Sequence, residues 1–180
     1  MKKHKPVLTT ALLNQSRRTI SKIYFPRIAL CLNALPEEAI WWRPNEASNS
    51  VGNLVLHLEG NVRQWIISGL GGKADHRDRD HEFAERGPVS CSALLARLQK
   101  TVAEADRILE KLDKPSLRRR YVIQKFKVTG IEAVCHVAEH FAFHAGQIIY
   151  ITKLKQGEDL GFTRLPGVKQ SGSQKNLPSV

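Results

Sequence analysis

The chain has 180 residues, of which 42% are hydrophobic and 25% charged, and this size and composition are typical of one globular domain rather than of a disordered chain. Three scattered cysteines argue against a disulfide framework and indicate a reducing, cytoplasmic setting, and the absence of a signal peptide and of an apolar run of ~20 residues predicts no membrane association. The 28 Lys and Arg residues against 17 Asp and Glu give a formal net charge of +11, which attracts anionic partners in general, nucleic acid included.

Hydrophobic periodicity predicts a first helix over about 8–35, with a short helical turn over 35–40. A second helix begins after a cap at Asn49 or Ser50 and ends near Leu70, before two glycines. The segment 75–86 is dense in charges of both signs and has no apolar stripe, so we interpret it as a solvated crossover. Ser90 caps a third helix that runs to Leu112.

Residues 117–128 mix β-branched, aromatic and basic side chains in partial alternation, which predicts a strand or a short hairpin. Thr129 then caps the longest helix, which runs to about Lys155. We expect one domain over 1–162 and a flexible tail over 163–180. The predicted fold is all-α, a four-helix bundle with a long crossover between its second and third helices, and such bundles build metal sites from side chains on facing helices.

Histidines recur at every fourth residue of the last helix, at His136, His140 and His144, and this spacing places them on one face. Two histidines one turn apart can hold one metal ion. The outer two are separated by a rise of about 12 Å, so all three cannot easily share one ion. The ligand pair is therefore either His136 with His140 or His140 with His144. On the second helix, His57 lies at the edge of a buried face and can supply a third ligand.

Another interpretation is that these histidines are partly buried bundle residues that bond to neighbouring polar groups. If they bind metal, three neutral imidazoles favour Zn²⁺, Ni²⁺, Cu²⁺ or Fe²⁺ over Mg²⁺ or Ca²⁺. Three protein ligands also leave one coordination position open for water or substrate. Glu59 and Glu139 point about 100–160° away from the nearest ligand direction, so we interpret them as solvent-exposed or ion-paired and identify no general base.

The string HFAFHAGQ at 140–147 resembles the H-x-x-x-H-x-G-Q signature of the DinB-like (YfiT-like) metal-binding four-helix bundles. The segment 49–61 is similar to the histidine segment on the second helix of that superfamily. With WWRP at 41–44 and RDRDHEF at 77–83, the resemblance is to a bacterial branch of unknown function, and it covers about residues 20–162.

The resemblance implies that His57, His140 and His144 are the metal ligands and that His136 is their neighbour. It also implies zinc or nickel as the metal, a homodimer, and a relationship to enzymes that use low-molecular-weight thiols as cosubstrates. Asn61 and Gln147 lie one turn beyond His57 and His144, where they are candidates for orienting a ligand or a bound water. Gln147 could equally be a buried residue at the end of the bundle.

We therefore expect a metal-dependent enzyme that transfers a thiol to a small-molecule electrophile, with metal-dependent hydrolysis as a neighbouring reaction. The first alternative is a non-catalytic structural or stress-related bundle in which the ion ties the second and fourth helices together. The second alternative is nucleic-acid binding through the basic residues of 118–127, with Tyr121 and Phe126 as stacking residues. We rank this reading below a solvated edge strand that positive charge protects.

Overall fold

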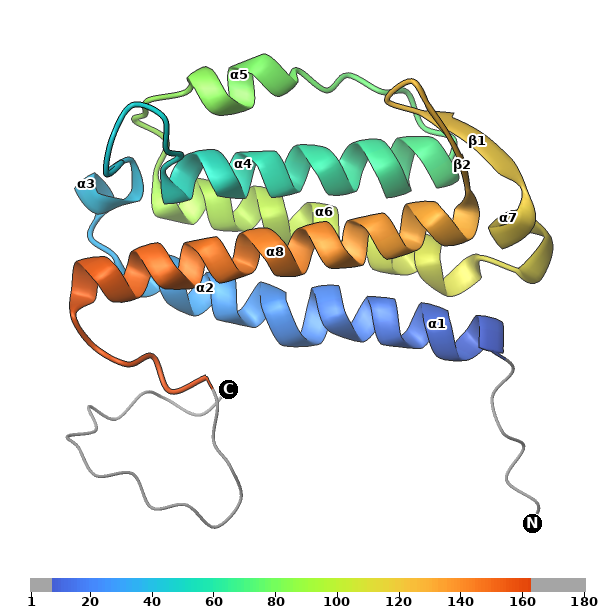
Figure 1. The fold of residues 1–180 in the computed structure, drawn as a ribbon, viewed down its shortest axis with the longest axis horizontal. Helices are drawn as coiled ribbons and strands as arrows, with labels where there is room; N and C mark the ends of the chain where they lie inside the picture. Colours follow the sequence, from blue (N-terminus) through green and yellow to red (C-terminus); the bar gives the residue numbers. More distant parts are fainter. Residues whose placement is uncertain (1–7, 163–180) are drawn as a thin grey trace, which may run out of the picture.

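A computed structural model describes residues 8–162, and its main elements are four helical arms that form a bundle (Figure 1). The first arm comprises α1 (Leu8–Arg17), the π-helical segment η1 (Arg18–Tyr24) and α2 (Phe25–Ala34). The second comprises α4 (Val51–Val62) and the π-helical segment η2 (Arg63–Leu70), and the others are α6 (Cys91–Lys111) and α8 (Gly130–Gln156). The predicted all-α fold is confirmed, whereas the tail predicted for 163–180 lies outside the described residues.

Short elements occupy the connections between the arms. Helix α3 (Glu37–Ile40) follows the first arm, α5 (Arg79–Ala84) lies in the crossover above α4, and α7 (Lys114–Arg118) follows α6. No helix within 8–162 combines the length and the apolar composition needed to cross a membrane.

Each of the three long helices after the first arm, α4, α6 and α8, begins with a side-chain cap. The Ser50 hydroxyl accepts a hydrogen bond from the Asn53 amide, while the Asn53 side-chain oxygen accepts one from the Ser50 amide. Ser90 caps α6 by accepting from the Ala93 amide, and Thr129 forms a reciprocal capping box with Glu132 at the start of α8. Such caps satisfy backbone donors that a helix N-terminus leaves unpaired.

The predicted hairpin before the last helix is confirmed. Strands β1 (Arg120–Ile123) and β2 (Phe126–Thr129) pair antiparallel, with Ile123 opposite Phe126. The two turn residues, Gln124 and Lys125, have φ angles of 50° and 70°, as a two-residue hairpin turn with left-handed backbone at both positions requires. The nucleic-acid interpretation requires Tyr121 to stack on a base. Tyr121 is buried, however, and its hydroxyl donates a hydrogen bond to the Ser116 carbonyl, so it is not free to stack.

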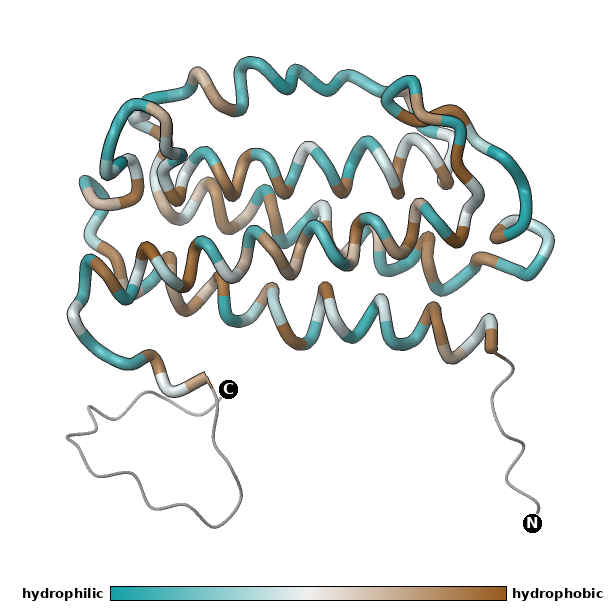
Figure 2. The backbone as a smooth tube through the Cα atoms, in the orientation of Figure 1, coloured by the Kyte–Doolittle hydropathy of each residue, from teal (hydrophilic) through white to brown (hydrophobic). Residues whose placement is uncertain are grey.

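Helix α4 is the centre of the molecule, and all of its residues are buried. It packs between α6 and α8, and α5 covers its remaining side. The crossover that carries α5 is mostly hydrophilic, whereas the bundle helices alternate between hydrophobic and hydrophilic residues (Figure 2). A polar residue on α4 therefore lies in the interior and must find a partner there.

A bidentate ion pair ties α1 to α6 and provides a test of the bundle at low pH. Arg17 donates from Nε and Nη2 to the two oxygens of Asp106, at 2.9 and 2.8 Å. The hydrogen bonds from Arg17 hold the pKa of Asp106 below its ordinary value of 3.8. Because that pKa is lowered in the folded state, the pair stabilises the fold above pH ~4 and loses this contribution as pH falls through the folded-state pKa.

Asp106→Asn is therefore expected to lower the free energy of unfolding by about 1 kcal/mol at neutral pH. Between neutral pH and an acidic pH below ~4, the deficit relative to wild type should shrink, because the contribution of the ion pair is lost as wild-type Asp106 takes up a proton. Urea unfolding of both proteins at the two pH values measures this deficit. Asp80→Asn, at an exposed position, is the control. An undiminished deficit at low pH would contradict the electrostatic origin.

Candidate metal centre

Three histidine side chains from two helices converge inside the bundle. His57 comes from α4, and His140 and His144 come from successive turns of α8. The Nε2 atoms of His57 and His140 lie 2.9 Å apart, and one ring nitrogen from each of the three residues lies within 4.8 Å of the others. No fourth His, Cys, Asp or Glu side chain from 8–162 joins this group. Among the alternatives left open by the helical spacing, the structure brings together the second pair, His140 with His144.

Glu82, on α5, determines which nitrogen of His57 faces the other two histidines. Its Oε2 lies 2.9 Å from His57 Nδ1. Burial alone would raise the pKa of Glu82, but hydrogen bonds from Arg77 and His57 outweigh burial and hold the pKa below its ordinary value. An ionised carboxylate only accepts, so Nδ1 carries the proton and Nε2 is left with a lone pair.

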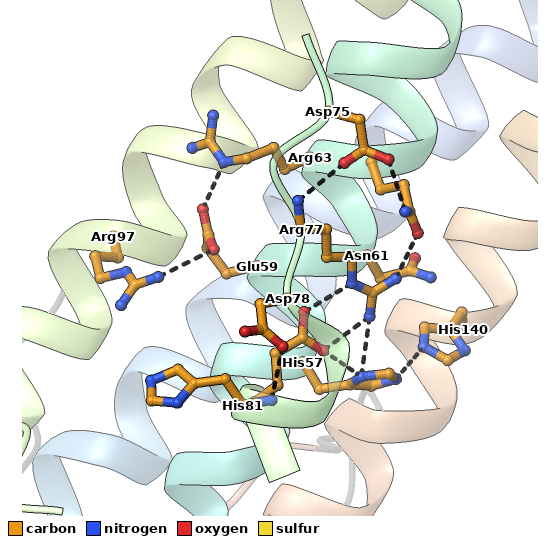
Figure 3. A network of polar contacts seen from close by, with 12 residues as sticks. His57, Glu59, Asn61, Arg63, Asp75, Arg77, Asp78, His81, Arg97 and His140 are labelled. Atoms are coloured by element: carbon orange, nitrogen blue, oxygen red, sulfur yellow. Dashed lines mark hydrogen bonds and ion pairs between the residues drawn. The ribbon is translucent and has the colours of Figure 1, made fainter. Parts of the chain in front are cut away.

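Arg77 holds the Glu82 carboxylate in place with two hydrogen bonds, and Figure 3 shows its guanidinium next to the His57 ring. Its Nε donates to Oε1 at 2.7 Å and its Nη2 donates to Oε2 at 2.9 Å, a bidentate geometry with few alternative orientations. Its Nη2 also lies 3.1 Å from His57 Nδ1, but two protonated nitrogens form no hydrogen bond, so Glu82 is the partner of His57. The Arg77 side chain is 2% exposed and that of Glu82 9%.

Two residues of α4 allow the crossover to reach the histidines. The Asn53 side-chain nitrogen donates to the backbone carbonyls of Glu82 and Glu85, at 2.9 Å each. Gly60 provides the space, because a Cβ at this position would lie 1.9 Å from Glu82 Oε1. Our interpretation of 75–86 as a solvated crossover is therefore wrong for Arg77 and Glu82. A glycine in the middle of a buried helix was the signal that could have indicated this close approach.

Gln147 fixes the orientation of His144. Its Oε1 lies 2.6 Å from His144 Nδ1, and because an amide oxygen accepts, Nδ1 is again the protonated nitrogen. The lone pair of His144 is therefore on Nε2, as it is in His57. The Gln147 side chain is exposed, so the alternative that Gln147 is a buried residue at the end of the bundle is wrong.

His136 and Asn61 lie beside the three histidines rather than among them. The His136 ring packs between Trp65 and His140, with ring centroids 4.0 and 5.3 Å away. Asn61 Nδ2 lies 3.4 Å from His136 Nε2, whereas Asn61 Oδ1 is buried and has no hydrogen-bond partner among the described residues. A buried carbonyl oxygen without a donor costs stability.

Burial and mutual repulsion favour the neutral form of the histidines on α8. Desolvation, followed by the proximity of His144 and His57, lowers the pKa of His140 to about 3. Burial also lowers the pKa of His144 and that of His136. Neutral imidazoles with free lone pairs are the form in which histidine binds metal ions.

Glu59 and Glu139 are the two acidic residues that were considered as general bases. Glu59 is ion-paired and Glu139 is exposed. Glu59 is buried, and its carboxylate bonds Arg63 at 2.9 Å and the Thr101 hydroxyl at 2.8 Å, on the side of α4 facing α6. The ion-pair interpretation of Glu59 is confirmed, and its alternative, solvent exposure, is wrong. Glu139 is exposed on α8.

Comparisons with known proteins agree with this architecture. A family model described as a protein of unknown function (DUF1572) matches residues 9–167. The fold is similar to the crystal structure of a DinB-like protein from Bacillus subtilis, with a TM-score of 0.59 and 19% sequence identity over 88% of this chain and 99% of that chain. At this identity the likeness shows the fold alone. No curated protein matches the chain in sequence.

Proposed function

Because this chain belongs to the DUF1572 family of unknown function and has a DinB-like fold, we propose that it is a metal-dependent enzyme that transfers a thiol to a small electrophile. The observation that carries this proposal is the convergence of three imidazoles, each from a buried or half-buried side chain, inside a bundle that offers no fourth protein ligand among the described residues. Three-ligand sites with one open position are typical of catalytic rather than structural metal centres.

The donor set fits a divalent transition metal. His57, His140 and His144 would bind it through nitrogen, and for His57 and His144 the hydrogen bonds to Glu82 and Gln147 leave Nε2 as the free atom. Nitrogen donors favour zinc, nickel, copper and iron over magnesium or calcium, and we propose zinc or nickel. The unpaired Oδ1 of Asn61 provides an acceptor for a small molecule bound beside His136.

A divalent ion bound there would supply Lewis acidity, which lowers the pKa of a thiol. Glu82 and Gln147 hold protons at the Nδ1 atoms of His57 and His144, and Asn61 accepts a hydrogen bond from an N–H or O–H of the bound molecule. In the transfer, the thiol sulfur forms a bond to the electrophilic carbon. The carbon's bond to the leaving group breaks, the leaving group takes the electron pair, and the thiol proton passes to solvent.

An assay with generic substrates tests this function. Protein loaded with Zn²⁺ or Ni²⁺ is mixed with cysteine or glutathione and 1-chloro-2,4-dinitrobenzene, and thioether formation is followed by absorbance. We expect a metal-dependent acceleration that His140→Ala lacks. If the loaded protein is no faster than the metal-free protein and metal only raises the melting temperature, the non-catalytic bundle is the better interpretation. Hydrolysis of a nitrophenyl ester without any thiol would favour the hydrolase.

The cysteine usage and the sequence resemblance also lead us to propose a cytoplasmic homodimer. Sedimentation of the purified chain tests the dimer. We assign nucleic acid no role as a partner in this proposal.

A further inference from the structure

A second feature of the molecule lies next to the histidine cluster and is not used by the chemistry above. A cavity of about 530 Å³ opens between α8 and the loop that precedes α4, within the size range of small-molecule sites. Its lining includes Pro44, Leu54, Phe143, Gly146, Gln147 and Tyr150.

Two residues that line the cavity are close in sequence to members of the histidine cluster. Gln147 lines the cavity, and the same side chain holds the Nδ1 proton of His144. Leu54 lies nearly one helical turn before His57 on α4, and its side chain is buried. The lining residues Leu54 and Gln147 therefore lie about one helical turn from His57 and His144 along their helices.

The wall formed by α8 has a gap between two aromatic side chains. Phe143 and Tyr150 are 64% and 69% exposed, and their spacing from Gly146 places all three on one side of the helix. A Cβ built at Gly146 meets no atom within 4 Å. Packing within the described chain therefore does not require this glycine, although a mid-helix glycine costs about 1 kcal/mol relative to alanine.

The chemistry of the lining indicates a neutral ligand. No residue that lines the cavity carries a charge, although a quarter of the whole chain is charged and its formal net charge is +11. Aromatic and aliphatic side chains supply most of the wall, and Ser48 and Asn49 supply polar groups at the loop. Aromatic rings prefer stacked or edge-on aromatic partners in such a site.

We propose that this cavity binds the neutral aromatic arm of the electrophilic substrate, with the reactive end of the substrate directed past Gln147 to the histidine cluster. The position of the reactive end rests on the proposed function, whereas the recognition of the aromatic arm rests on the cavity alone. The gap at Gly146 is the position where the ring enters between Phe143 and Tyr150.

Binding of 2-naphthol to the full chain tests the cavity without an activity assay. Chemical-shift changes of backbone amides report which residues the probe contacts. In wild type we expect saturable changes at Phe143, Gly146 and Tyr150. Gly146→Leu fills the gap and should weaken binding by about tenfold or more, whereas Gly146→Ala should leave it nearly unchanged. Glu139→Leu adds the same side chain to α8 outside the cavity and is the matched control. Both Gly146 variants should melt at or above the wild-type temperature, because leucine and alanine are better helix formers than glycine.

Two results would overturn the proposal. One is that Gly146→Leu binds 2-naphthol as tightly as wild type. The other is that the probe leaves the cavity amides unmoved while Gly146→Leu dissociates a dimer, because the cavity is then covered by a second copy of the chain. Metal content is measured on the same samples. Probe binding without metal binding would refute the proposed function and leave the cavity as an aromatic site, whereas metal binding without probe binding would refute the cavity alone.

Discussion

Replacing His140 by alanine is expected to weaken Zn²⁺ binding by about a thousandfold or more. Its Nε2 lies 2.9 Å from that of His57, and its ring centroid lies 4.4 Å from that of His144, so it is close to both of the other proposed ligands. Two remaining imidazoles hold an ion far more weakly than three. Competition with a chromophoric chelator measures the affinity, and His57→Ala and His144→Ala should show losses of the same order.

His136→Ala is the matched control for this series. His136 belongs to the same helical stripe, but its ring packs on Trp65 and its nitrogen faces Asn61. We expect its affinity for Zn²⁺ to stay within a few-fold of wild type. If His136→Ala loses the metal and His144→Ala keeps it, the ligand pair is His136 with His140 and the geometry proposed here is wrong.

Glu82→Ala is expected to produce two separate losses. The free energy of unfolding should fall by about 3 kcal/mol, because the buried Arg77 guanidinium loses its carboxylate partner. The affinity for Zn²⁺ should fall by about 10- to 100-fold, because nothing then fixes the proton on His57 Nδ1. Urea unfolding of the metal-free protein and chelator competition measure the two effects independently.

Two further variants separate the roles of the Glu82 carboxylate. Arg77→Met combined with Glu82→Met removes both buried charges and also the acceptor for His57 Nδ1, so it should recover part of the stability but not the metal affinity. Gly60→Ala keeps the carboxylate but displaces it, so it should weaken metal binding in the same direction as Glu82→Ala. Unchanged Zn²⁺ affinity in both Glu82→Ala and Gly60→Ala would show that His57 needs no orienting partner.

The helices and their caps are predictable from the sequence because their causes are local. Ser50, Ser90 and Thr129 each cap a helix at the position that the sequence indicates, since a cap needs only a neighbouring amide. The hairpin was also predicted, although its turn lacks the asparagine and glycine that usually accept left-handed backbone.

The partner of His57 is not predictable in the same way because it depends on contacts between distant segments, whereas Gln147, the partner of His144, lies one turn away on the same helix. Glu82 and Arg77 lie in a charge-rich segment that has the composition of a solvated loop, and only its path across α4 buries them. Helical spacing likewise left two ligand pairs open. The packing of His136 against Trp65 on the second arm is a tertiary contact that distinguishes them.

The measurement that tests the metal centre most directly is anomalous X-ray diffraction from crystals of the tag-free protein supplied with Zn²⁺ or Ni²⁺. We expect one strong peak for each chain, about 2.0–2.1 Å from a nitrogen of each of His57, His140 and His144. A peak bonded to His136 in place of His144, or no peak inside the bundle, would contradict the proposed site.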